Sequence, residues 1–190
     1  MTENAEKAYL ISEFNGHMFP TKSWDSEAHR REHAIRHARV LNAAAAGENI
    51  SGCFGWCMFD YNTHKEFGSG DRICYHGVLD MFRNPKLAAA VYASQQDAKP
   101  VLEISSTMNI GEQPGGYIGG VVVLTNGDSV RLYKNNELIG QYFPAPSYGH
   151  LMHPPIVITD FCGREPGERR KASMRKTADL IKTMAEVEKK

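Results

Sequence analysis

The sequence predicts a mixed α/β chain that starts as a repeat of strand and helix and continues as a small antiparallel β unit. In residues 8–96, short apolar runs alternate with stretches of helical periodicity, which is the order of a (β/α) fold. Further along, short β-branched runs are separated by turn signals such as Asn126-Gly127. That pattern is typical of a β-sandwich.

The first strand–helix unit is predicted from residues 8–13 and 25–46. The run at 8–13 is short, apolar and β-favouring, which indicates a strand buried on both faces. Asp25 or Ser26 is suited to cap the helix, and Gly47 to end it. Its apolar stripe is formed by Ala34, Ile35, Ala38 and Leu41.

The second unit follows the same order. A strand rich in Phe and Trp is predicted over 50–61 and closes on the carboxylate of Asp60. The next helix is expected to begin with Asn84 as N-cap and Pro85 at its first position, and to end near residue 96.

The pattern changes at Lys99-Pro100, which predicts one domain over 1–98 and a second over 99–190. A proline-rich stretch at 144–167 is expected to be loop-like, and the charged tail from residue 168 is expected to be a helix. Strands of the second domain are predicted over 101–106, 117–125, 130–133, 138–143 and 156–158.

Composition excludes some classes of function. The 22 basic and 22 acidic side chains balance, whereas a general nucleic-acid binder needs an excess of positive charge. No apolar run reaches the roughly 18 residues that a membrane span requires. The first residues are polar, so no signal peptide is expected at this end. The 4 cysteines are too few for a disulfide framework and favour a reducing, cytoplasmic location.

Two carboxylates lie at the ends of predicted strands, Glu13 and Asp60. In (β/α) barrels, the chemistry occurs at the C-terminal ends of the strands. A buried carboxylate is costly unless it is paired, so an acid at this position is either a structural hydrogen-bonding group or a catalytic one. Trp56 lies close by in sequence, and an aromatic ring there could serve as a platform for a sugar or as part of the core.

A histidine series on the first helix offers an alternative, a zinc site. His29 and His33 match the H-x-x-E-H pattern of one class of zinc peptidase, and His37 continues the series at helical spacing. The match is short, and the two intervening arginines would place positive charge near a cation. We therefore expect a solvated polar face and no metal site.

Cys53 and Cys57 are four residues apart in the second predicted strand. In an extended strand they would face the same side about 13 Å apart, too far for one disulfide or one zinc tetrahedron. We expect both to be core residues.

Two segments of the first half carry a family resemblance: residues 11–18 (ISEFNGHM) and 52–60 (GCFGWCMFD). Together they resemble the last part of the catalytic barrel of glycoside hydrolase family 2, especially the β-galactosidases. Residues 124–140 resemble the immunoglobulin-like domain that follows this barrel. The resemblance implies the last two βα units of a TIM barrel, followed by an antiparallel immunoglobulin-like β-sandwich.

The same resemblance implies roles for individual residues. Glu13 corresponds to the nucleophile at the end of the seventh barrel strand, and Trp56 to an aromatic residue that lines the sugar subsite. His17 and His76 correspond approximately to substrate-binding positions. Because Cys74 and His76 replace the Asn-x-Lys pair of the β-glucuronidases, we expect a β-galactoside rather than an acidic sugar. No cofactor is implied.

The resemblance also implies that the chain is a fragment. A complete barrel takes about 250 residues, and a retaining glycosidase needs a second carboxylate, so the isolated chain is expected to be inactive. The strands of an incomplete barrel would leave open edges through which the chain could self-associate. The competing hypothesis is a β-sandwich that binds carbohydrate or protein without catalysis.

Overall fold

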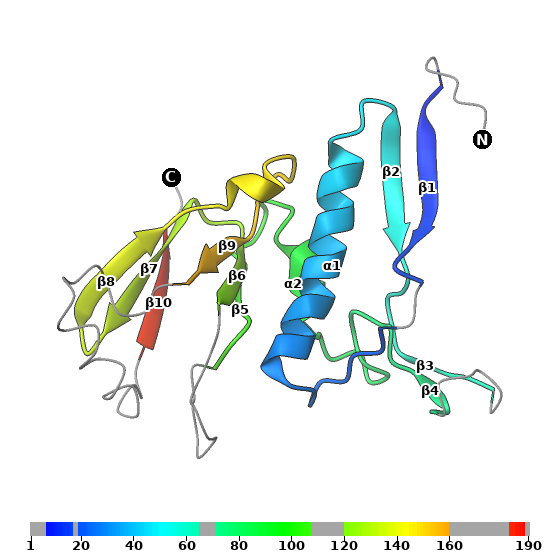
Figure 1. The fold of residues 1–190 in the computed structure, drawn as a ribbon, viewed down its shortest axis with the longest axis horizontal. Helices are drawn as coiled ribbons and strands as arrows, with labels where there is room; N and C mark the ends of the chain where they lie inside the picture. The colour runs from blue at the N-terminus through cyan, green and yellow to red at the C-terminus, as the bar shows by residue number, and fades with distance from the viewer. Residues whose placement is uncertain (1–6, 17–18, 65–70, 108–119, 160–182, 189–190) are drawn as a thin grey trace.

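The computed structural model of the chain describes residues 7–16, 19–64, 71–107, 120–159 and 183–188. In Figure 1 the elements form successive layers, with helices α1 and α2 between the β1–β2 pair and the sheet that contains β6. A further sheet, containing β7, lies on the other side of β6. The molecule is therefore mixed α/β, as the order of the predicted elements indicated.

The first unit is a strand, a helix and a parallel strand. Strands β1 (Tyr9–Phe14) and β2 (Ile50–Gly55) pair in parallel, and α1 (Glu27–Ala45) connects them. Ser26 is the N-cap of α1, and its side chain accepts a hydrogen bond from the backbone N–H of His29. The predicted strand–helix–strand order is confirmed, and the predicted apolar stripe packs inward.

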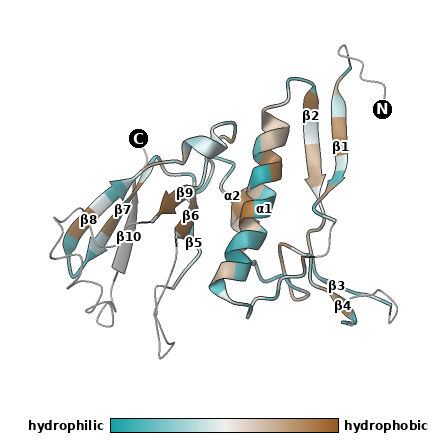
Figure 2. Cartoon of the chain, in the orientation of Figure 1, coloured by the Kyte–Doolittle hydropathy of each residue, from teal (hydrophilic) through white to brown (hydrophobic). Residues whose placement is uncertain are grey.

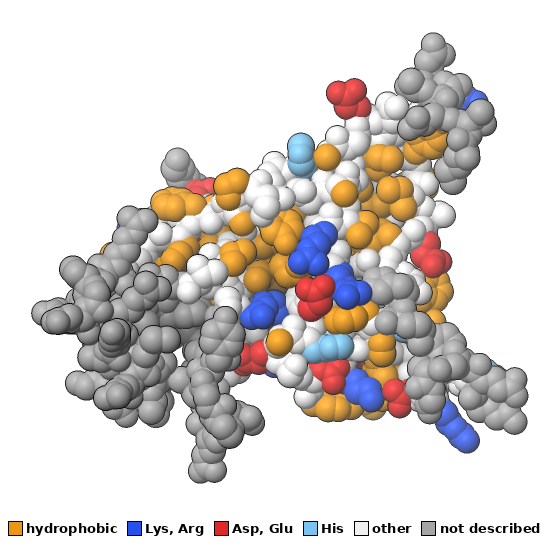
Figure 3. All heavy atoms as spheres, viewed as in Figure 1, with side chains coloured by type: hydrophobic (Ala, Val, Ile, Leu, Met, Phe, Trp, Pro, Cys, Tyr) orange, Lys and Arg blue, Asp and Glu red, His pale blue; other side chains and the backbone are white. Residues whose placement is uncertain are grey.

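Strand β1 is less buried than we predicted. Its side chains alternate between half-buried and exposed from Tyr9 to Ser12, Glu13 is also exposed, and Leu10 is 58% exposed. Within the described residues β1 pairs only with β2, so its other edge is open. Figure 3 shows apolar side chains on the surface in this part of the molecule.

The second predicted strand is shorter than expected. It ends at Gly55, and the chain resumes pairing only at β3 (Tyr61–Asn62), which forms an antiparallel pair with β4 (Ile73–Cys74). A single strand over 50–61 was therefore wrong. The apolar composition of the segment indicated a strand but could not locate the break at Trp56.

Helix α2 (Leu87–Ala93) begins two residues later than predicted, with Lys86 as its N-cap. Asn84 is held elsewhere, because the carboxylate of Asp80 accepts hydrogen bonds from its backbone and side-chain N–H groups. The prediction of Asn84 as N-cap was wrong, since this local turn outcompetes the capping arrangement.

The second half contains two three-stranded antiparallel sheets that face each other, with the orders β5–β6–β9 and β10–β7–β8. A short 3₁₀ helix, Pro146–Tyr148, precedes β9. The strands are Leu102–Ile104 (β5), Val121–Thr125 (β6), Ser129–Lys134 (β7), Glu137–Tyr142 (β8), Ile156–Ile158 (β9) and Thr183–Glu188 (β10).

Strand β10 corrects the prediction for the tail. The described part of the tail, Thr183–Glu188, pairs with β7 instead of forming a helix, and the rest of 168–190 lies outside the described residues. The backbone groups along the edge of β7 give this segment inter-strand partners, which the charge pattern of the tail did not reveal.

Strand β6 belongs to both cores of the molecule, and all five of its residues are buried. Val121 and Val123 contact the core between the two sheets, whereas Val122 and Leu124 contact the core formed by the helices. Figure 2 shows the hydrophobic colour of β6 and β9 between the more polar elements. The predicted division at residue 98 is thus crossed by one continuous apolar cluster. No helix among the described residues has both the length and the apolar character needed to cross a bilayer.

Candidate functional site

Glu13 lies at the C-terminal end of β1, where its side chain is exposed. The chain turns immediately afterwards, and Asn15 adopts a left-handed conformation with φ of 59°. The Glu13 carboxylate lies over the backbone of Gly16, because a Cβ atom placed there would be 2.5 Å from its Oε1 atom. A glycine at this position thus leaves room for the carboxylate.

Trp56 lies at the corresponding end of the neighbouring strand. Its backbone N–H donates to the carbonyl of Phe14 at 2.7 Å, and Phe14 pairs with Gly55 in the parallel register. The indole is 39% exposed. Parallel strands end at the same edge of their sheet, so Glu13 and Trp56 share one rim.

Tyr61 packs against Trp56, and Cys74 and His76 lie next to Tyr61. The rings of Trp56 and Tyr61 meet edge to face, with centroids 6.0 Å apart and planes at 85°. The neighbouring Cys74 thiol, followed by burial, raises the pKa of Tyr61 to about 12. Cys74 Sγ lies 2.7 Å from His76 Nδ1, and both residues are buried. Tyr61 pairs with Cys74 across the β3–β4 ladder, so the buried pair of Cys74 and His76 lies beside Tyr61.

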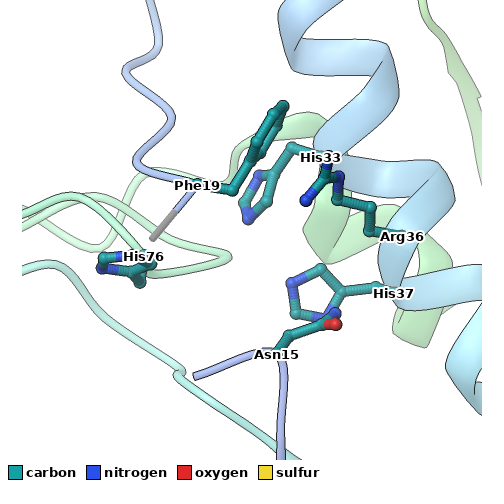
Figure 4. Close-up of a pocket in the computed structure, with 6 residues that line it drawn as sticks. All are labelled: Asn15, Phe19, His33, Arg36, His37 and His76. Carbon is teal, nitrogen blue, oxygen red and sulfur yellow. The ribbon is translucent and has the colours of Figure 1, made fainter. Parts of the chain in front are cut away.

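The predicted histidine helix face is buried rather than solvated. His33 and His37 are among the buried residues of α1, and Figure 4 shows their rings pointing into a pocket that also receives Asn15 and His76. The prediction of a solvated polar face was wrong for these two residues. Arg36 lines the same pocket, and the charged residues elsewhere on α1, such as Arg30, Glu32 and Arg39, gave the segment its polar composition.

The pocket is too small for a sugar ring. The volume open to the centres of water molecules is about 10 Å³, roughly the space of one water. Burial lowers the pKa of His33 to about 3, with the nearby positive groups contributing, so its imidazole is neutral in the folded protein. His37 Nδ1 lies 2.7 Å from the Tyr92 hydroxyl, which ties α1 to α2.

The histidines do not form a metal site with their neighbours. His29 lies apart from the other two and stacks on Phe19, with ring centroids 4.3 Å apart. Across the described ranges, no group of three or more His, Cys, Asp or Glu side chains is arranged to hold a metal ion.

Asp60, the second strand-end carboxylate, has a structural role. Its Oδ1 atom accepts from Lys86 Nζ at 2.6 Å and from the backbone N–H of Gly77 at 2.8 Å. Both charged side chains are only 2% exposed. Burial raises the pKa of Asp60, and the contact with Lys86 opposes that rise. The sequence left open whether a strand-end acid is structural or catalytic, and the geometry of Asp60 supports the structural, hydrogen-bonding role.

The remaining predicted residues have mixed outcomes. His17 lies outside the described residues. Cys53 and Cys57 are free thiols but only half-buried, so describing both as core residues was wrong; burial still raises the pKa of Cys57 to about 12. Sequence reasoning missed Tyr61, whose only signal was its position one residue after Asp60.

No protein-family model matches the chain, but curated β-galactosidases do. The β-galactosidase of Thermoanaerobacterium thermosulfurigenes is 49% identical over 154 residues, which are 79% of this chain and 22% of that protein. The β-galactosidase of Rhizobium meliloti is 42% identical over 155 residues, 79% of this chain and 20% of that protein. The chain thus spans about a fifth of the length of these relatives.

Solved structures agree in fold. Bacteroides uniformis β-glucuronidase 2, covalently bound to cyclophellitol-6-carboxylate aziridine, has a TM-score of 0.61 at 16% identity, covering 95% of this chain and 22% of that one. A β-glucuronidase from glycoside hydrolase family 2 has a TM-score of 0.56 at 19% identity, with coverage of 94% and 20%. The predicted resemblance is confirmed: the chain is a homologue of the β-galactosidases and shares the fold of a segment of glycoside hydrolase family 2 enzymes.

Proposed function

We propose that the chain is a segment of a retaining glycoside hydrolase of the β-galactosidase type, with Glu13 as the nucleophile. The observation that carries the proposal is the shared rim, where Glu13 and the partly exposed Trp56 follow adjacent parallel strands. In this assignment, residues 1–98 are the last two βα units of a TIM barrel, and residues 99–190 are an immunoglobulin-like sandwich.

The proposed reaction uses Glu13 in a double displacement. Its carboxylate attacks the anomeric carbon while the glycosidic C–O bond breaks, and the leaving oxygen takes a proton from a second carboxyl group. Water then hydrolyses the glycosyl–enzyme ester, giving its proton to that same second group. The second carboxyl group would come from outside the segment matched here.

A neutral sugar is the proposed substrate. Trp56 offers an aromatic surface suited to the apolar face of a galactose ring. Cys74 and His76, which stand where the β-glucuronidases carry the Asn-x-Lys pair, are buried and bonded to each other, which supports a neutral rather than an acidic sugar. Both curated relatives described above carry the name β-galactosidase, which supports this choice of substrate class.

The test grafts this chain into a relative. The matching segment of the Thermoanaerobacterium thermosulfurigenes β-galactosidase is replaced by this chain, and hydrolysis of nitrophenyl β-galactoside is measured. We expect an active hybrid in which Glu13→Gln lowers kcat by at least about a thousandfold, because a nucleophile has no substitute. The purified chain alone should release no nitrophenol.

The control is Glu48→Gln, an exposed carboxylate before β2 at the opposite end of the same strand pair. The hybrid should tolerate this change. Full activity of the hybrid with Glu13→Gln would refute the assignment, and hydrolysis by the isolated chain that depends on Glu13 would refute its predicted inactivity.

A further inference from the structure

We propose that Gly16 is a positioning residue for Glu13, because a residue without a side chain lets the Glu13 carboxylate lie against the turn that follows β1. The proposal rests on the proposed function in one respect, that Glu13 is the nucleophile. It goes beyond that function by naming the neighbour that sets where the reacting oxygen lies.

The first step of the argument is the contact itself. A Cβ atom on Gly16 would lie 2.5 Å from Glu13 Oε1 and 3.6 Å from Glu13 Cδ. Ordinary contact begins at 3.4 Å, so a methyl group would push Oε1 away by about 0.9 Å. Among the described residues, and apart from the chain neighbours of Gly16, that methyl group would meet Glu13 alone.

The second step concerns which group would move. Glu13 is exposed, and a long exposed side chain changes its rotamer easily. The turn is held more firmly, because Phe14 is buried and its carbonyl accepts from the backbone N–H of Trp56 at 2.7 Å. Asn15 points its side chain into the pocket of Figure 4. A substitution at Gly16 should therefore displace the carboxylate and leave the backbone in place.

The third step is that the backbone does not itself require glycine at this position. Gly16 is exposed, and its φ angle lies outside the left-handed region, so an alanine can adopt its conformation. The left-handed step of the turn is made by Asn15, with φ of 59°. The need for a glycine thus comes from the carboxylate rather than from the chain conformation.

The test is Gly16→Ala in the hybrid enzyme described above. Misplacing a reacting group by about 1 Å can lower a rate about a hundredfold. We therefore expect kcat for nitrophenyl β-galactoside to fall about a hundredfold. KM should change less than about twofold, because the proposed sugar contact at Trp56 is untouched.

The covalent step can also be followed alone, with a galactosyl fluoride whose ring carries a second fluorine that slows hydrolysis of the ester. A Glu13 oxygen bonds to the anomeric carbon as the C–F bond breaks and fluoride leaves, and mass spectrometry detects the ester. The rate of ester formation should fall in Gly16→Ala in parallel with kcat.

The matched control is Gly120→Ala, the same substitution where the nearest atom to the new Cβ would be Thr159 Cγ2 at 3.6 Å. It should leave kcat and KM unchanged. Neither variant should unfold at a lower denaturant concentration than the parent hybrid. A loss of kcat at unchanged stability separates displacement of the carboxylate from damage to the fold.

A double-mutant cycle identifies the displaced group. In Glu13→Asp the side chain is one methylene shorter, so its carboxylate no longer reaches a methyl group at position 16. Gly16→Ala should then lower kcat less than about threefold in the Glu13→Asp background. A merely structural role of Gly16 would give the same loss in both backgrounds and would overturn the proposal.

The outcomes separate this inference from the proposed function. Full kcat in Gly16→Ala, in a hybrid that Glu13→Gln inactivates, would overturn the positioning role and leave the nucleophile assignment intact. Full activity in Glu13→Gln would refute the proposed function, and this inference with it.

Discussion

At the scale of residues, the buried pair of Asp60 and Lys86 joins the elements beneath the rim. Lys86 Nζ donates to the Thr21 carbonyl as well as to Asp60, so one ammonium group ties the loop after β1 to the segment after β2. Burying two charges costs free energy, and their mutual attraction offsets that cost only when both charges are present. This arrangement makes its members sensitive to single substitutions.

We predict that Lys86→Met destabilises the fold by about 3–5 kcal/mol at neutral pH, because Asp60 is left as an unpaired buried charge. The cost should shrink toward pH 4. Asp60 already has a raised pKa, and without Lys86 it takes up a proton more readily in the folded state than in the unfolded one. Stability of the variant should therefore fall as pH rises through that folded-state pKa.

Denaturant unfolding at several pH values measures both effects. Lys22→Met is the control, since its ion pair with Asp71 is partly exposed at 3.4 Å and should contribute less than about 1 kcal/mol. Equal losses in the two variants, or a Lys86→Met loss that is independent of pH, would contradict the account.

The sequence predicted part of the site at this scale. Glu13 directly follows one apolar run and Trp56 lies in the next, which are local features, whereas their proposed roles came from the family resemblance. Tyr61 and Cys74 come together only through the β3–β4 ladder. His33 could be placed on a helix, but it lines a pocket with Asn15, Phe19 and His76 from other segments, which no local pattern encodes.

At the scale of elements, the β1–β2 pair has an open side. Leu10 and Phe54, one on each strand, are 58% and 60% exposed, whereas the opposite side of the pair is covered by α1. Open strand edges with apolar side chains favour pairing with another chain. Self-association stays a prediction, and these two residues mark the surface at which we expect it.

We predict that the purified chain self-associates and that Leu10→Lys or Phe54→Lys shifts it toward monomer, because a charge on this surface opposes contact with a second apolar surface. Sedimentation velocity at increasing concentration measures the change. Met152→Lys, at an exposed position in a loop of the other half, should have no effect. If the wild-type chain is monomeric at all concentrations, the open side of the β1–β2 pair does not mediate self-association.

Predictability differed among the elements for physical reasons. Helix α1 was located well because its Ser26 cap and apolar stripe are local signals. Strand β10 was missed because a charged, lysine-rich tail has the composition of a solvated helix, and only the available edge of β7 makes it a strand. The start of α2 moved because Asp80 holds Asn84 in a competing turn.

At the scale of the whole molecule, the two predicted domains share a core. Val122 and Leu124 of β6 pack with Ile35 of α1 and Val91 of α2. The opposite face of the same strand packs against Leu132 of β7. A sandwich separated from residues 1–98 would expose one face of β6 to water, so the two halves should stabilise each other.

We therefore predict that the chain unfolds in a single transition. Both tryptophans lie within residues 1–98, so their fluorescence reports that half alone. Leu132→Ala, in the other half, should lower the fluorescence-detected midpoint just as Ile35→Ala does, because each loses about 2–5 kcal/mol from a common fold. A fluorescence midpoint that responds to Ile35→Ala but not to Leu132→Ala would show that the two halves unfold independently. That outcome would favour the hypothesis of a β-sandwich that binds carbohydrate or protein without the barrel segment.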